Sequence, residues 1–150
     1  MGSYVNSHLD PGETVTYETS LHWIVYLSPV LFLGVGAVFS LPGNAPGLFY
    51  GGLAILAVGL ISLLAAWIRQ TSSEFAVTSR RVIIKVGFLS RRTIELNMSK
   101  VESVQVDQDI FGRLLNYGTI TVMGTGGTRE PFALINDPMA FRHAVQAEQT

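Results

Sequence analysis

Apolar residues dominate one long block near the start of the chain. Between Trp23 and Ile68, 46 consecutive residues include no Asp, Glu, Lys or Arg. A segment rich in Pro and Gly, residues 42–47, divides this block into apolar runs of 19 residues (23–41) and 21 residues (48–68). Each run is close to the roughly 20 residues that cross a bilayer core of about 30 Å. The pattern therefore predicts a transmembrane helical hairpin with a tight loop at its tip.

Two buried core helices of a soluble protein are the alternative explanation of this block. The roughly 80 residues that follow could not cover both helices on all sides. The charge distribution also orients the hairpin, because all ten Lys and Arg residues lie from Arg69 onward and the loop carries no charge. Basic flanks remain on the cytoplasmic side of a membrane. We therefore expect a multi-pass protein, integral to the lipid bilayer, with a cytoplasmic N-terminal segment (1–22) and a cytoplasmic C-terminus.

After the apolar block the pattern changes to alternation of apolar and polar positions. Period-two alternation between turn residues is typical of antiparallel sheet with one face buried. Residues 110–115 break the alternation and are expected to form a helical turn or a bent connection. The expected strands cover residues 74–78, 82–86, 92–96, 104–107, 119–123 and 132–134.

The pattern at the end of the chain predicts a helix. Asp137 is a favourable N-cap and Pro138 suits the first helical position. We therefore expect the hairpin to be followed by a mainly antiparallel β barrel or sandwich with one C-terminal α-helix, over residues 74–147. An apolar stripe on this helix would cover a sheet or close a barrel end, and its members are Ala140, Phe141, Ala144 and Val145.

About six short strands and one terminal helix form the outline of a pleckstrin-homology (PH)-like domain. Closer sequence similarity lies in the segments PGE (11–13), His22-Trp23, FAVTSRRV (75–82), GFLSRR (87–92), VESV (101–104) and FGRLLNYGTI (111–120). In their order and spacing these segments resemble the bacterial PH-domain membrane proteins of the YdbS/YdbT type, formerly labelled a domain of unknown function. The resemblance spans nearly the whole chain. It implies a PH-like fold and a place in the bacterial inner (plasma) membrane, and no agreed activity.

The residue types that form catalytic or metal sites are sparse in this chain. There is no cysteine, and His8, His22 and His143 are isolated and in unlike contexts. Residues 124–127 are glycine-rich but lack the Lys-Ser/Thr of a phosphate loop, so they are interpreted as a hairpin turn. We therefore expect no enzyme activity, no metal and no cofactor.

Basic residues near the first strands are candidates for contact with anionic lipid head groups. Two predicted turns, near 79–80 and 87–91, could emerge at the same rim of a barrel. Such residues are attracted to an anionic leaflet; alternatively they are solvated charges that block edge pairing. A net charge of +2 over residues 69–150 is a weak basis for nucleic-acid binding. The candidates are Arg69, Arg80, Arg81, Lys85, Arg91 and Arg92.

Small residues within the apolar runs are candidates for helix packing. Gly36 and Ser40 in the first run, and Gly47 and Gly51 in the second, have the four-residue spacing that allows close helix contact. They would pack the hairpin against itself or against another subunit.

These features predict a membrane-anchored PH-like binding or scaffold module at the cytoplasmic face. It would contact a protein partner or anionic lipid without catalysis. The alternative is a structural subunit of a larger membrane complex, homo-oligomeric or with another protein, that packs through the hairpin.

Overall fold

The computed structural model describes residues 3–87, 91–127 and 129–150, and it divides into two compact units. Trp23–Thr71 form one unit, and Met1–His22 together with Ser72–Thr150 form the other. The apolar unit is thus inserted within the sequence of the second unit. Part of the GFLSRR segment, residues 88–90, lies outside the described residues.

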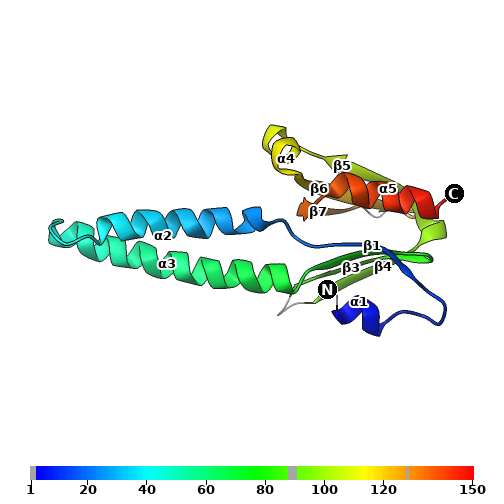
Figure 1. Ribbon diagram of the computed structural model, residues 1–150, viewed down its shortest axis with the longest axis horizontal. Coiled ribbons are helices and arrows are strands. Elements are labelled where there is room, and N and C mark those ends of the chain that lie inside the picture. The colour runs from blue at the N-terminus through cyan, green and yellow to red at the C-terminus, as the bar shows by residue number, and fades with distance from the viewer. Residues whose placement is uncertain (1–2, 88–90, 128) are drawn as a thin grey trace. The chain divides into compact units, whose positions relative to one another are not determined.

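The inserted unit is a pair of helices that lie side by side (Figure 1). A 3₁₀ turn, η1 (Trp23–Tyr26), leads into α2 (Leu27–Phe39), and α3 (Pro46–Thr71) follows. By length and composition α3 is a candidate membrane span, whereas Trp23–Phe39 is a shorter apolar helix. The described residues therefore contain a helical hairpin with one candidate span, where two were expected. The first α-helix is shorter than the expected run because the first four residues of that run, Trp23–Tyr26, form the 3₁₀ turn η1 and the helix ends at Phe39. Pro42 disfavours helix in the residue before it.

Glycines form the contact between α2 and α3. Gly36, Gly52 and Gly59 are buried there. A Cβ added to Gly36 would lie 2.7 Å from the Leu56 amide nitrogen, and one added to Gly52 would lie 2.6 Å from the Ser40 hydroxyl oxygen. Absence of a side chain at these positions is what allows the two backbones to approach so closely. Gly36 and Ser40 therefore lie at the contact between the two helices.

The other two expected packing residues lie outside this contact. Gly47 and Gly51 are exposed, and a Cβ added to either would have no neighbouring atom within 4 Å. Gly47 and Gly51 therefore do not pack within the hairpin, and their packing against another subunit stays a prediction. Buried small residues of α3 recur every seven positions instead, at Gly52, Gly59 and Ala66. A seven-residue repeat keeps one face of a helix against its partner, as in a coiled coil, and this spacing was the better signal in the sequence.

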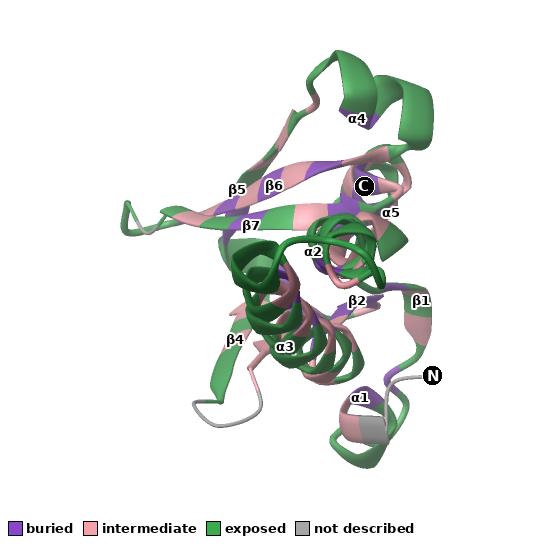
Figure 2. Cartoon of the chain, turned by 90° about the vertical axis from the view of Figure 1, so that its left-hand side faces the viewer, coloured by how far each residue is buried: buried purple, intermediate pink, exposed green. Residues whose placement is uncertain are grey.

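The outward faces of both helices are largely exposed (Figure 2). The exposed residues include many large apolar side chains. With glycines inside and large apolar residues outside, the hairpin reverses the usual distribution of a soluble protein. Leu31, Phe32, Val35 and Val38 on α2, and Leu53, Val58, Leu60, Ile61 and Leu64 on α3, are among the exposed residues.

The second unit contains two antiparallel sheets, in strand orders β1-β2-β3-β4 and β5-β6-β7. All six expected strands are present, with bounds that differ by a few residues, and residues 110–115 form the short helix α4. The elements are α1 (Ser3–Ser7), β1 (Val15–Thr19), β2 (Glu74–Thr78), β3 (Arg81–Val86), β4 (Arg92–Asn97), η2 (Met98–Lys100), β5 (Val101–Asp107), α4 (Ile110–Leu115), β6 (Tyr117–Gly124), β7 (Arg129–Asn136) and α5 (Pro138–Glu148).

The strand β1 was not predicted from the sequence. It pairs antiparallel with β2, and Thr19 lies opposite Phe75. Residues 1–22 and 74–147, expected as separate parts of the chain, are therefore joined by strand hydrogen bonds. The helical hairpin occupies the connection between two neighbouring strands.

One face of β2 and β3 meets the second sheet. Phe75 pairs with Ile84 on this face, and the Phe75 ring lies 5.8 Å from that of Phe132 on β7 in a T-shaped contact. The terminal helix α5 closes this core with the buried Phe141 and contacts strands of both sheets. Asp137 caps α5 as expected, accepting a hydrogen bond from the Ala140 amide. Two sheets closed by a C-terminal helix constitute a PH-like fold.

The opposite face of β2 and β3 is also buried, contrary to the expectation of a sheet with one buried face. Ala76 and Ile83 on this face are fully buried in a cluster with Val5 of α1. The N-terminal helix therefore covers a surface that would otherwise be exposed and apolar.

Substitution of Gly52 by Ala tests the close contact of α2 and α3. The new Cβ would overlap Ser40, which costs about 1–3 kcal/mol of overpacking and exceeds the roughly 1 kcal/mol gain in helix propensity. We expect Gly52→Ala to lower the thermal unfolding temperature of the full chain in detergent, measured by circular dichroism. Gly51→Ala is the matched control, because position 51 is open. Equal effects of the two substitutions would contradict the packing described above.

Candidate functional site

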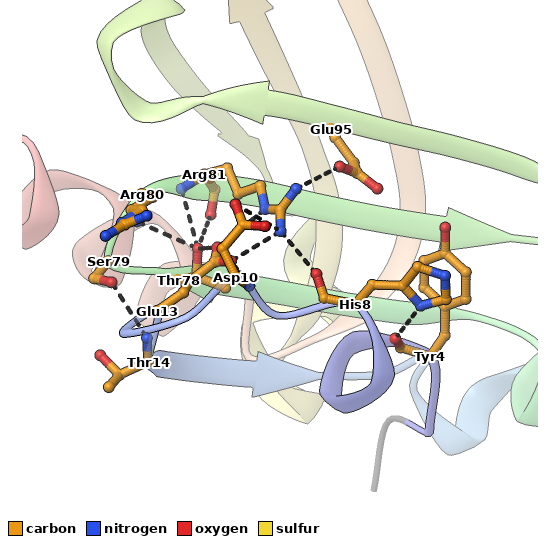
Figure 3. Close-up of polar contacts among 10 residues, drawn as sticks. All are labelled: Tyr4, His8, Asp10, Glu13, Thr14, Thr78, Ser79, Arg80, Arg81 and Glu95. Carbon is orange, nitrogen blue, oxygen red and sulfur yellow. Dashed lines mark hydrogen bonds and ion pairs between the residues drawn. The ribbon is translucent and has the colours of Figure 1, made fainter.

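Arg81 is the centre of an ion-pair network (Figure 3). Its Nη2 lies 2.8 Å from Glu13 Oε2 and 3.5 Å from Asp10 Oδ2, and its Nη1 lies 2.8 Å from Glu95 Oε2. The same Nη2 donates a hydrogen bond to the His8 carbonyl oxygen at 2.8 Å. One guanidinium group thereby connects the N-terminal segment to β3 and β4.

Glu13 is the buried partner in this network. Its side chain has no exposed surface, and its carboxylate accepts hydrogen bonds from Arg81 Nε at 3.0 Å and from the Thr78 hydroxyl at 2.5 Å. The hydrogen bond from Arg81 lowers the pKa of Glu13 to about 2, helped by the Thr78 hydroxyl and the Asp10 amide and opposed by burial. Hydrogen bonding to Glu13 correspondingly raises the pKa of Arg81. The Arg81 guanidinium therefore stabilises the fold, and its contacts with Glu13, Glu95 and the His8 carbonyl oxygen occupy the groups that could bind a lipid head group.

Lys85 also interacts with groups of its own unit. Its Nζ lies 3.7 Å from Glu74 Oε1 and 4.7 Å from the centroid of the Tyr4 ring. The Glu74 carboxylate accepts hydrogen bonds from the Tyr4 and Val5 amides at 3.1 and 3.3 Å. Lys85 and Glu74 together hold α1 against the sheet.

The basic residues near the two turns do not share one rim, and that expectation is wrong. In the pairing of β3 with β4, Arg81 lies opposite Asn97, and Val86 lies opposite Arg92. Since consecutive turns of an antiparallel sheet lie at opposite ends of its strands, Arg81 and Arg92 are separated by about 17 Å along β3.

One end of this sheet carries both connections to the helical hairpin. Thr19 is the last residue of β1, Glu74 is the first of β2, and Lys85 lies opposite Glu74. We call this the proximal end of the unit. Arg91 and Arg92 belong to the proximal end, while Arg80 and Arg81 belong to the opposite, distal end.

The remaining candidate cations differ in their surroundings. Arg92 Nη2 lies 2.7 Å from the Glu130 carboxylate, with 61% of the Arg92 side chain exposed. Arg80 and Arg91 are exposed, and neither forms an ion pair with any residue in 3–87, 91–127 or 129–150. Arg69 is exposed in the last turn of α3, where a positive charge complements the helix dipole.

A depression of about 520 Å³ lies at the base of α4. Asp109 lines it and caps α4 by accepting a hydrogen bond from the Gly112 amide at 2.5 Å. This carboxylate is therefore part of a helix cap. The depression is lined by Asp107, Gln108, Asp109, Tyr117, Gly118, Thr119 and Leu134.

The histidines make local contacts in separate places. His8 stacks on Tyr4, and His22 lies 5.3 Å from the Tyr117 ring, measured between ring centroids. His143 is exposed on α5. Within the described part of the chain, no group of three or more His, Asp or Glu residues could hold a metal ion.

Sequence reasoning missed the partner of Arg81. Glu13 stands in the PGE segment, and Thr78 and Arg81 stand in the FAVTSRRV segment, more than sixty residues away. Both segments contribute to the family resemblance, and the structure brings them into contact. Three acidic residues, Asp10, Glu13 and Glu18, in an N-terminal segment without Lys or Arg were the signal that could have indicated a distant basic partner.

Comparison with known proteins adds one finding. A family model described as Bacterial PH domain matches residues 30–149, which include most of α2 and all of α3 as well as β2–β7. No curated protein and no solved structure matches the chain.

The buried Glu13–Arg81 pair predicts a loss of stability in acid. Because the pKa of Glu13 is lowered in the folded state, its contribution is present above about pH 4.5 and is lost as pH falls towards 2. We expect Glu13→Gln to reduce the unfolding free energy at pH 7 by about 3 kcal/mol. It should also flatten the acid dependence below pH 4.5.

Urea unfolding of the full chain in detergent at a series of pH values measures both effects. Glu102→Gln, at an exposed position of β5, is the control and should change neither. An unfolding free energy in Glu13→Gln equal to that of the unsubstituted chain would contradict the structural role of the pair.

Proposed function

Since this chain belongs to the bacterial PH domain family, we propose that it is a membrane-anchored binding module. PH domains are generally non-catalytic binding or scaffold modules. In this proposal the helical hairpin crosses the bacterial inner membrane, and the PH-like unit contacts anionic lipid or a protein partner at the cytoplasmic face.

The observation that carries this proposal is the distribution of residues in the hairpin, with glycines buried at the helix contact and large apolar residues exposed. Only 11% of the most apolar window of α3 is buried, although a core helix of a soluble protein would be mostly buried. The described part of Trp23–Thr71 contains no charged residue before Arg69. Such a surface is stable when lipid surrounds it.

The length of the first helix is compatible with a second span. The four residues of η1 rise about 2.0 Å each and the thirteen residues of α2 about 1.5 Å each, which gives about 28 Å. This is close to the hydrocarbon thickness of about 30 Å. The exposed Trp23 and Trp67 would then lie near the ends of their spans, where aromatic belts form.

The proximal end is the surface most suited to contact anionic lipid. It carries the exposed Arg91 and the largely exposed Arg92, and it is the end from which the chain continues into both helices. The distal Arg80 lies away from these connections. Of the six basic candidates for lipid contact, we therefore retain Arg91 and Arg92, together with Arg69 in the adjoining helix.

An apolar groove supports the second candidate function, packing within a larger membrane complex. The groove has a volume of about 350 Å³ and is lined by Leu27, Leu31, Phe32, Val35 and Ile55, with Ser28. Another apolar helix could occupy it. Crosslinking in native membranes distinguishes this function, because a partner in the groove would give a defined adduct and an isolated hairpin would give monomer.

Reporter fusions test the proposed anchoring and orientation. We expect a green fluorescent protein fused after Thr150 to fluoresce and alkaline phosphatase at the same site to be inactive. Phosphatase inserted in the loop near Asn44 should be active, because the uncharged loop crosses the membrane. A phosphatase active at Thr150, or a chain released from membranes by carbonate, would overturn the proposal.

A charge substitution tests the lipid surface. Removal of one arginine near an anionic leaflet costs about 1 kcal/mol, a factor of about five in affinity. We expect Arg91→Gln to reduce the retention of phosphatidylglycerol by the full chain about fivefold, as measured by native mass spectrometry. Arg80→Gln at the distal end is the matched control and should retain the lipid. An equal loss of phosphatidylglycerol in both variants would show that the proximal end has no special role in lipid binding.

A further inference from the structure

The short helix α4 presents apolar side chains to solvent. Ile110 is 84% exposed, Phe111 66% and Leu114 79%. The neighbouring Leu115 is 36% exposed. Four large apolar residues in one helix of six are thus left outside the core, although the same unit fully buries residues of this type elsewhere. Exposed apolar clusters of this kind mark contact sites.

Hydrogen bonds at both ends hold α4 in this conformation. Asp109 accepts from the Gly112 amide at its start, and Asn116, in the left-handed conformation with φ 60°, ends it by donating its amide to the Gly112 carbonyl. Gln108 Nε2 donates to the Gly112 and Tyr117 carbonyl oxygens at 3.2 and 2.9 Å. A Cβ on Gly112 would lie 2.6 Å from the Tyr117 oxygen, so glycine is required there. These hydrogen bonds fix the conformation of α4, and its apolar side chains are therefore held in their outward direction.

The position of α4 within its unit is defined by His22. This residue hydrogen-bonds to the Leu115 backbone, and its own amide donates to the Leu134 carbonyl at 2.7 Å. The next residue, Trp23, is the first of the apolar unit. The C-terminal end of α4 therefore adjoins the point at which the chain leaves for the helical hairpin, and α4 belongs to the proximal end.

A bilayer matches this surface better than a folded partner does. A helix of six residues is about 9 Å long. It cannot supply the roughly 800 Å² that each partner buries in a specific protein interface. Insertion of a few apolar side chains at the boundary of head groups and acyl chains needs no such area. Arg113, exposed between Phe111 and Leu114, suits an anionic head-group layer.

We propose that α4 is an additional membrane contact, whose residues Ile110, Phe111 and Leu114 insert into the interfacial layer of the bilayer that holds the hairpin. This inference rests on the proposed membrane anchoring. With the hairpin connections and α4 both at the proximal end, the PH-like unit would meet the membrane through α4 as well as through the hairpin. Its proximal end would then face the head groups in a fixed orientation. The capping carboxylate Asp109 would remain at the aqueous base of α4.

Single-cysteine labelling of the full chain tests this inference, because the chain has no native cysteine. Leu114→Cys, Leu60→Cys and Glu102→Cys are each labelled with an environment-sensitive fluorophore and reconstituted in nanodiscs that contain phosphatidylglycerol. All three positions are exposed in the structure, so labels there leave the core intact. Lipids with a quencher near the head groups or at mid-chain then report the surroundings of each label.

We expect the emission of the label at position 114 to be blue-shifted and to be quenched by the lipid whose quencher lies near the head groups. The label at 60, in α3, should be quenched by the mid-chain lipid. The label at 102 should be quenched by neither, because β5 begins just after η2, whose Met98 amide donates to the carbonyl of the distal Arg80. Quenching at 60 without quenching at 114 overturns the contact of α4 and leaves the anchoring intact. Absence of quenching at 60 overturns the anchoring, and the inference with it.

Discussion

The pairing of β1 with β2 is the constraint on which the rest of the structure depends. These strands are neighbours in the sheet, yet 54 residues, numbers 20–73, separate them in the sequence. Because Thr19 lies opposite Phe75, both ends of the connection begin side by side. An antiparallel helix pair returns the chain close to where it left, so the hairpin can fill this connection without disturbing the sheet. The glycine contact between α2 and α3 serves the same requirement, since it keeps the two helices close.

The N-terminal segment stabilises the PH-like unit in three ways. It adds an edge strand, it covers the apolar outer face of β2 and β3 with Val5, and it supplies Glu13 to the buried pair with Arg81. The two ends of β3 thus have different roles. Arg81 binds the N-terminal segment at the distal end. The Glu74–Lys85 pair holds α1 at the proximal end, where exposed arginines and the apolar α4 also lie.

Local patterns were sufficient to predict most of this fold. Alternation located the six strands after the hairpin, and Asp137 with Pro138 located α5, because these signals are contained within a few residues. β1 was missed although Val15–Thr19 alternates, because the strand has only five residues and its pairing partner lies beyond the hairpin. The roles of Arg81 and Lys85 could not be predicted either, since their partners Glu13 and Glu74 are brought to them by tertiary contacts. The prediction that the basic residues share one rim was wrong because successive turns of an antiparallel meander lie at alternate ends of the sheet.

Replacement of Trp23–Thr71 by a short Gly-Ser linker tests the account most directly. If the hairpin is a membrane insert in the β1–β2 connection, the shortened chain should be soluble without detergent and should unfold cooperatively, with a β-rich circular dichroism spectrum. The full chain should remain with the membrane after a carbonate wash. An unfolded shortened chain would contradict the strand pairing as the organising contact, and a full chain that the wash releases would contradict the anchor.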